Sequence, residues 1–186
     1  MIRKTKGFTL IELLIVVAII GILAALLIPN IMSAIQRGRQ KGTMGDMHTL
    51  ATNLTDYITE NTQFPTTITS LTAVQNNLDF LLGFYARRIP QRDKWGNPLY
   101  VALGAGFSDR GYPLQGATAG PDEFMLCSYG RDGNDDGWEF DNQTTYGDSD
   151  TADFYEVNGM SDFARDIVII NGDFAHAPAS AVGTGS

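Results

Sequence analysis

A single apolar block lies near the start of the chain, after a short basic leader, and apolar residues return at helical spacing beyond it. The block runs from Phe8 to Ile28, and Glu12 is its only charged residue. As a helix it would be about 31 Å long, which matches the roughly 30 Å hydrocarbon core of a bilayer. Apolar residues return at helical spacing at Ile31 and Ile35 and again from Met44 to Ile58, and Gly38, Gly42 and Gly45 interrupt the pattern. This pattern predicts one long N-terminal helix, ending near Glu60, whose later half is half-buried.

Beyond this helix the pattern predicts a small α+β head. The segment Asn61–Pro65 ends the helix, and leucines spaced through Ile68–Phe84 predict a second helix. After Pro90, Gly, Asp and Asn become frequent, and three short runs have the composition of β-strands: Pro98–Leu103, Glu123–Tyr129 and Asp166–Ile170. The tail Ala175–Ser186 is small and polar, and we expect it to be loosely held.

Glu12 is informative because a carboxylate inside a membrane-length segment is costly and usually marks a function. A cleaved secretory signal peptide would have an apolar core of about 7–15 residues before a small-residue cleavage site, and this block is longer. A plain uncleaved anchor would explain the length of the block, but it would explain neither Glu12 nor the Gly7–Phe8 pair at its entrance.

The segment GFTLIELLIVVAIIGILAALLIPN resembles the N-terminus of type IV pilins and of the pseudopilins of type II secretion systems. The resemblance implies that a prepilin peptidase cuts after Gly7, that the new amine of Phe8 is methylated, and that Glu12 is the fifth mature residue. In a staggered stack of helices, Glu12 of one subunit would meet the Phe8 amine of the next. Such pairing at low dielectric specifies register more than it adds stability.

Several internal segments narrow the resemblance to the major pseudopilin of type II secretion systems. They are Gln63-Phe64-Pro65-Thr66-Thr67, the run Asp93-Lys94-Trp95-Gly96-Asn97-Pro98, the turn Gly130-Arg131-Asp132-Gly133, and Asp166-Ile167. The resemblance implies a type IV pilin-like α+β fold, in which the long helix packs on a small antiparallel sheet and a calcium-binding loop follows. The chain departs from the family in its longer and more acidic insertion, Asp135–Phe163.

The acidic loop, residues 130–166, contains the opening half of a calcium-binding motif. Asp132-Gly133-Asn134-Asp135-Asp136-Gly137 places oxygen donors at positions 1, 3 and 5 and a glycine at position 6. Trp138 would supply the backbone carbonyl of position 7, whereas Gln143 stands where a bidentate Glu is usual. The remaining ligands must then come from farther along, and the candidates are Asp148, Asp150, Asp153, Asp162 and Asp166. Our predicted ligand set is Asp132, Asn134, Asp136, Trp138, Asp162 and Asp166. The alternative is a solvated acidic loop that keeps the head soluble.

Other functional classes find less support. Cys127 is the single cysteine, so no intramolecular disulfide can form, and its apolar neighbours indicate a core residue. His48 and His176 stand in no nucleophile–base motif, so we predict no enzyme and no catalytic residues. Without the leader the chain has ten basic and 21 acidic residues, which disfavours nucleic-acid binding.

The sequence therefore predicts a cleaved basic leader (residues 1–7), a transmembrane and assembly helix (8–32), an amphipathic continuation (33–60) and a globular head (61–186). As a major pseudopilin, the chain would form a helical homopolymer that drives protein export across the outer membrane. Its partners would be prepilin peptidase, an inner-membrane assembly platform and minor pseudopilins. It would cross the bacterial inner membrane once, with the head in the periplasm. The alternatives are the major subunit of an extracellular type IVa surface pilus, for adhesion or motility, and a membrane-anchored periplasmic enzyme or binding protein.

Overall fold

The N-terminal part of the structure is one long helix. The computed structural model describes residues 7–108, 110, 112, 118–138 and 154–181. Helix α1 spans Leu10–Asn61 and includes Pro29. It is the one helix in the described ranges that is long and apolar enough to cross a membrane. It ends one residue beyond the position that the sequence predicts.

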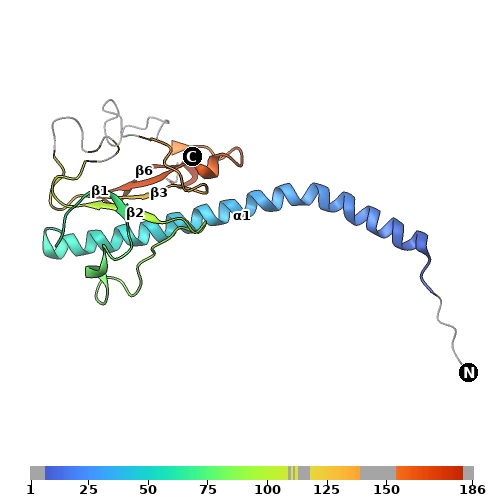
Figure 1. Ribbon diagram of the computed structural model, residues 1–186, viewed down its shortest axis with the longest axis horizontal. Coiled ribbons are helices and arrows are strands. Elements are labelled where there is room, and N and C mark those ends of the chain that lie inside the picture. Colours follow the sequence, from blue (N-terminus) through green and yellow to red (C-terminus); the bar gives the residue numbers. More distant parts are fainter. Residues whose placement is uncertain (1–6, 109, 111, 113–117, 139–153, 182–186) are drawn as a thin grey trace, which may run out of the picture. The chain divides into compact units, whose positions relative to one another are not determined.

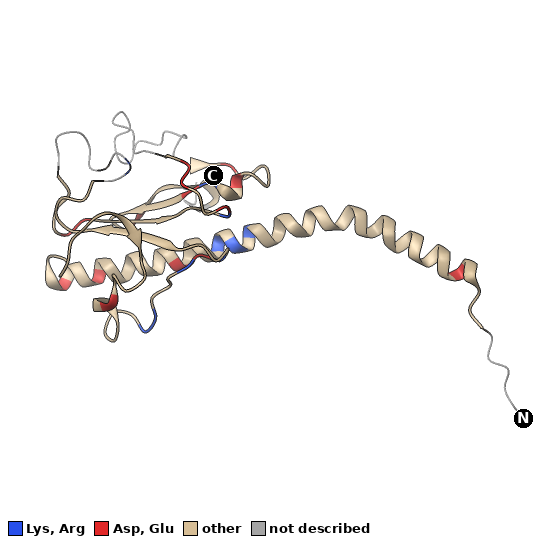
Figure 2. Ribbon diagram, in the orientation of Figure 1, with Lys and Arg blue, Asp and Glu red and all other residues tan. Residues whose placement is uncertain are grey.

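Contacts divide the chain into two compact units, Met1–Gln36 and Arg37–Ser186, which we describe separately. In the first unit the large apolar side chains from Phe8 to Ile35 are about half exposed or more, and Figure 2 shows how few charges this stretch of α1 carries. A helix that is apolar all round is typical of a membrane span or of a helix covered by other chains.

The second unit contains a six-stranded sheet in the order β1-β2-β3-β5-β6-β4 (Figure 1). The neighbouring strands are antiparallel except β4 and β6, which are parallel. The strands are β1 (Ile68–Ala73), β2 (Leu99–Leu103), β3 (Phe124–Ser128), β4 (Phe154–Tyr155), β5 (Ile167–Ile170) and β6 (Asp173–Pro178). Three single-turn 3₁₀ helices also occur: η1 (Asp79–Leu81), η2 (Asp162–Ala164) and η3 (Ala179–Ala181).

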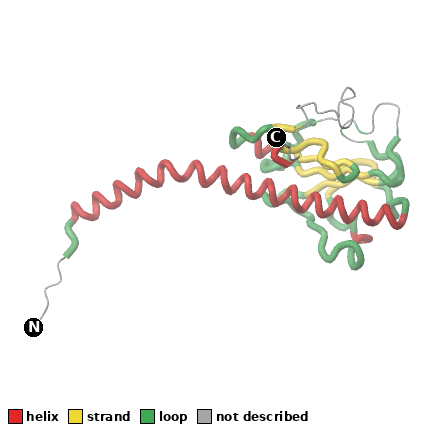
Figure 3. The backbone as a smooth tube through the Cα atoms, turned by 180° about the vertical axis from the view of Figure 1, so that it is seen from behind, coloured by secondary structure: helices red, strands yellow, loops and turns green. Residues whose placement is uncertain are grey.

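Both faces of the sheet are covered, which explains why β3 and β5 are buried along their whole length. The later half of α1 lies along one face (Figures 1 and 3), where Met47, Leu50 and Leu54 pack with alternate residues of the strands. On the other face Phe107 packs in a second cluster with Cys127 and its strand neighbours. Cys127 is therefore a core residue, as predicted. The predicted α+β class and pilin-like arrangement are confirmed.

Three strands confirm sequence predictions, and two segments correct them. β2, β3 and β5 lie within the three predicted β-type runs. The predicted helix over Ile68–Phe84 is wrong, because Ile68–Ala73 forms β1 beside β2 and only the single turn of η1 follows. The β-branched residues of this segment favour a strand once a partner edge is available. The expectation of a loose tail is wrong as far as residue 181, because β6 pairs with both β5 and β4. Residues 182–186 lie outside the described ranges.

Candidate functional site

The residues predicted for processing and assembly lie at the start of α1. Gly7 and Phe8 precede the helix, and the Phe8 side chain is 77% exposed. The rest of the predicted leader, residues 1–6, lies outside the described ranges. Thr9 and Glu12 form a capping box: the Thr9 amide and hydroxyl donate to Glu12 Oε2 at 2.8 and 2.7 Å, and the Glu12 amide donates to Thr9 Oγ1 at 3.3 Å. Sequence reasoning missed this box, although the Thr-x-x-Glu spacing signals it. Glu12 therefore has a local role in addition to any role in assembly.

The Gly130–Gly133 turn joins the start of the acidic loop to its end. Gly130 has φ +62°, and a Cβ placed on it would meet the Ala164 and Arg165 carbonyl oxygens. The Arg131 amide donates to the Phe163 carbonyl at 2.8 Å. These contacts hold the turn against the segment that leads into Asp166, so the two ends of the loop lie together.

Asp93 organises the neighbouring turn. Its Oδ1 accepts hydrogen bonds from the amides of Trp95, Gly96 and Asn97 at 2.8–2.9 Å, and its Oδ2 accepts one from Ser128 Oγ at 3.1 Å. Asn97 in turn donates through Nδ2 to the Gly130 carbonyl at 2.7 Å. The Asp-x-Trp-Gly-Asn-Pro segment thus positions the Gly130–Gly133 turn, a link that the sequence did not reveal.

Three of the six predicted calcium ligands come together beside a buried arginine. Asp136 and Asp166 exchange hydrogen bonds, each backbone amide donating to the carboxylate of the other residue at 3.2–3.3 Å. Asp166 is fully buried, and its Oδ1 has no hydrogen-bond partner among the described residues. Arg110 Nη1 lies 2.8 Å from Asp166 Oδ2 and donates to the Trp138 carbonyl at 3.1 Å. Burial raises the pKa of Asp166 to about 7. The Arg110 guanidinium opposes this rise, and the Asp136 carboxylate adds to it.

The other three predicted ligands are engaged in their own turns. Asp132 and Asn134 are exposed, and Asp132 Oδ1 accepts the Asn134 amide at 3.2 Å. Asp162 Oδ2 accepts the Gly159 and Asn158 amides at 2.7 and 2.9 Å, and these hydrogen bonds lower the pKa of Asp162. The further candidates Asp148, Asp150 and Asp153 lie outside the described ranges.

The donor chemistry of this cluster suits calcium, although the set is incomplete. Carboxylates and a backbone carbonyl are the oxygen ligands that calcium takes, and the buried Asp166 Oδ1 offers an unused acceptor. Within the described ranges, no group of three or more His, Cys, Asp or Glu side chains is arranged to hold a metal ion. Asp136, Trp138 and Asp166 are therefore the residues that fit a calcium ion, and further ligands would have to join them.

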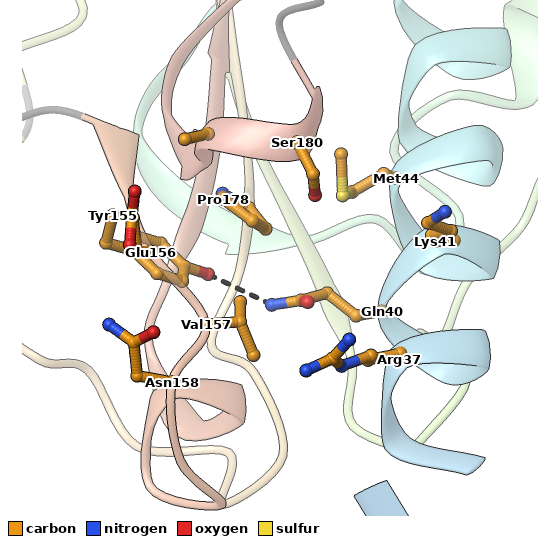
Figure 4. A pocket seen from close by; sticks show the side chains of 11 residues that line it. Arg37, Gln40, Lys41, Met44, Tyr155, Glu156, Val157, Asn158, Pro178 and Ser180 are labelled. Atoms are coloured by element: carbon orange, nitrogen blue, oxygen red, sulfur yellow. Dashed lines mark hydrogen bonds between the residues drawn. The ribbon is translucent and has the colours of Figure 1, made fainter. Parts of the chain in front are cut away.

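A pocket of about 420 Å³ lies within the second unit, between the part of α1 from Arg37 onward and the C-terminal segments (Figure 4). Arg37 and Lys41 line one wall, and Gln40 Nε2 donates to Tyr155 Oη across it at 3.3 Å. Burial raises the pKa of the Tyr155 hydroxyl.

The comparisons with known proteins agree on one family. Residues 2–28 match the family model described as "Prokaryotic N-terminal methylation motif", and residues 30–146 match "Type II secretion system (T2SS), protein G". The chain is similar to proteins named "Type II secretion system core protein G" from three bacteria. The Pseudomonas aeruginosa protein is 34% identical over 147 residues, which cover 75% of this chain and 92% of that protein. The Aeromonas hydrophila protein is 37% identical over 111 residues (56% and 76%), and the Vibrio cholerae protein is 31% identical over 139 residues (72% and 87%).

No solved structure shows a significant match to this chain. The matched ranges include the N-terminal motif, Asp93–Pro98 and the Gly130–Gly133 turn, which are among the segments that suggested the major pseudopilins, whereas Asp166-Ile167 lies beyond them. With its methylation motif, its long apolar helix and its small sheet, this chain belongs to the family of type II secretion system protein G, the major pseudopilins.

Proposed function

We propose that this chain, cut after Gly7 by prepilin peptidase and methylated on Phe8, polymerises into the pseudopilus of a type II secretion system. The observation that carries the proposal is the first part of α1, whose apolar side chains are exposed on all sides. Such a surface needs either lipid or the same surface of neighbouring subunits. The membrane would hold the subunit before assembly, with the second unit in the periplasm. The filament would then form on an inner-membrane assembly platform together with minor pseudopilins.

In the filament, the role proposed for Glu12 is to neutralise the Phe8 amine of the adjacent subunit. Processing creates a positive charge four residues from Glu12, and in an apolar helix bundle neither charge is solvated. Uncompensated charges of this kind are costly in a low-dielectric medium, so only a register that pairs them is favourable. The ion pair thus selects the axial stagger between subunits.

The function is tested by fractionating cells that express the native secretion system and sequencing the mature N-terminus by mass spectrometry. We expect a chain that begins at methylated Phe8 and remains in the cell envelope. Abundance in fibres sheared from the cell surface would support a surface pilus instead. A chain that still begins at Met1 would contradict both filament functions.

Two substitutions at Glu12 separate assembly from helix capping. Glu12→Ala removes both the charge and the capping box, whereas Glu12→Gln removes the charge but keeps a side chain that can close the box. We expect both variants to insert and to be processed, and both to yield at least about tenfold less filament, equivalent to a loss of about 1.4 kcal/mol. Filament yield is measured after chemical crosslinking in the envelope. Normal assembly of Glu12→Gln would reduce the role of Glu12 to capping.

We further propose that calcium stabilises the acidic loop through Asp136, Asp166 and the Trp138 carbonyl. The ion would neutralise the neighbouring carboxylates of Asp136 and Asp166, and it would use Asp166 Oδ1, which has no hydrogen-bond partner among the described residues. Calcium at ten times its dissociation constant would stabilise the fold by about 1.4 kcal/mol. Extracellular calcium modules bind at about 10⁻⁴ to 10⁻³ M, so millimolar concentrations are the relevant range.

This proposal is tested on the full-length chain in detergent micelles. Both tryptophans, Trp95 and Trp138, lie in the sheet-bearing part, so their fluorescence follows its unfolding. We expect millimolar calcium to raise the melting temperature and a chelator to reverse the rise. Magnesium is the control, because its strict octahedral geometry and its tightly held waters suit this site poorly. A melting temperature that responds to neither calcium nor chelator would contradict calcium binding.

A further inference from the structure

The Arg110 side chain is a buried cation that contacts both described ends of the acidic loop. It comes from the segment between β2 and β3, and its side chain is 3% exposed. Arginine is rarely buried unless it is paired, and here two carboxylates and a carbonyl surround it. Its Cζ also lies 5.3 Å from the centre of the Tyr129 ring, within cation–π distance.

The groups that Arg110 binds overlap those that would bind calcium. Nη1 contacts Asp166 Oδ2 and the Trp138 carbonyl, and both residues belong to the predicted ligand set. Nη2 lies 2.8 Å from Asp135 Oδ1. Asp135 directly precedes Asp136, which is the third of these predicted ligands. A guanidinium is a permanent cation with a rigid fork of donors, so it can satisfy several oxygens at once without a metal.

Arg110 already binds Asp166 Oδ2 and the Trp138 carbonyl, and it leaves only Asp166 Oδ1 unused for calcium. A calcium ion at this carboxylate would also lie close to the guanidinium, and the two cations repel each other. We propose that Arg110 is a resident cation that holds Asp166 and the Trp138 carbonyl together when calcium is absent and that competes with calcium for them. This inference rests on the calcium site proposed above. It predicts that Asp136, Trp138 and Asp166 stay together without metal and that they bind calcium more weakly because of the neighbouring arginine.

The test compares the wild type with Arg110→Gln, using full-length chain in micelles and tryptophan fluorescence. Removing one partner of a buried ion pair leaves the other charge uncompensated. In chelator we therefore expect the melting temperature of Arg110→Gln to fall by about 10 °C. Calcium should restore most of that fall. The variant should reach a half-maximal response at a calcium concentration about tenfold lower than the wild type, which corresponds to about 1.4 kcal/mol.

Arg165→Gln is the matched control, because Arg165 is adjacent to Asp166 in sequence but is half exposed and lies 4.0 Å from Asp162. It removes the same charge from the same region, so it should leave the calcium response close to that of the wild type. Arg110→Lys covers the case in which Arg110→Gln fails to fold. This variant keeps the positive charge but loses the planar set of guanidinium donors. We therefore expect its calcium affinity to lie between those of the wild type and Arg110→Gln.

The outcomes distinguish the inference from the calcium site itself. Tighter calcium binding by Arg110→Gln than by both the wild type and Arg165→Gln would support competition. Equal calcium affinity in all variants would overturn the competition and leave the calcium site standing. Isothermal titration that detects no calcium binding to any variant would overturn both.

Discussion

Alanine at Gly130 is expected to destabilise the sheet-bearing part by more than about 3 kcal/mol. Gly130 has φ +62°, where a side chain costs about 1–2 kcal/mol. The new Cβ would also lie 2.6 Å from the Arg165 carbonyl oxygen and closer still to that of Ala164. Both neighbours are backbone atoms, which cannot move aside as a flexible side chain would, and overpacking of this kind adds about 1–3 kcal/mol. Urea unfolding of full-length protein in chelator, followed by tryptophan fluorescence, measures the effect.

Gly137→Ala is the control for the backbone contribution. Gly137 has φ +71°, close to the value at Gly130, but no atom of the described residues lies within 4 Å of a Cβ placed there. We expect Gly137→Ala to lower the free energy of unfolding by only about 1 kcal/mol, because a side chain is disfavoured in the left-handed conformation. Equal losses at the two glycines would show that the contact with the Ala164–Arg165 carbonyls contributes nothing.

The second large effect is expected at Asp93, where alanine should cost about 3 kcal/mol or more. Asp93 is 5% exposed and accepts four hydrogen bonds, three of them from consecutive backbone amides. Each donor left unsatisfied on burial costs about 1–3 kcal/mol, although water can reach part of this turn. Asp93→Asn keeps Oδ1 for the three amides, and its amide group can donate to Ser128 Oγ. We therefore expect Asp93→Asn to lose less than about 1 kcal/mol in the same urea measurement.

The pH dependence of stability gives an independent check on Asp93. Burial raises its pKa, and the hydrogen bonds from Asn97 and Ser128 only partly oppose this. Between the unfolded and folded pKa values the native state therefore binds more protons than the unfolded state. The free energy of unfolding contributed by Asp93 falls as the pH rises through this window from about pH 4 upward. This contribution should disappear in Asp93→Asn. An unchanged pH profile would mean that Asp93 ionises as it does in the unfolded chain.

The elements that could be predicted from sequence are those with a strong local pattern. The block Phe8–Ile28 is recognisable from its length and its apolar composition. The strands β3 and β5 are recognisable because a strand buried on both faces consists of a continuous apolar run. β1 was missed because Leu71 and the apolar residues after it fit helical spacing, while its partner β2 lies almost thirty residues away. β6 was missed because Ala175, His176 and Ala177 have little preference for strands, and only pairing on both sides fixes them.

Some residues of the candidate site could likewise be predicted from the sequence, and others could not. Asp136, Trp138 and Asp166 were named from oxygen spacing and family resemblance, and the structure brings them together. Arg110 was missed because a lone arginine in a Gly-rich segment carries no motif, and its partners lie 25 to 56 positions later in the chain. Asp93 was quoted only as part of the Asp-x-Trp-Gly-Asn-Pro segment. Its link to the Gly130–Gly133 turn through Asn97 depends on tertiary packing.

The place of β6 inside the sheet constrains the order of folding during export. Until residues up to Pro178 are available, β5 presents an unpaired edge whose residues Ile167–Ile170 are all apolar. An exposed, flat apolar edge of this kind is prone to pair with other chains. In the proposed topology the head follows the membrane helix across the inner membrane, so β6 would arrive after the other five strands. We expect the sheet to be completed only at that stage, and the β5 edge to be prone to aggregation until then.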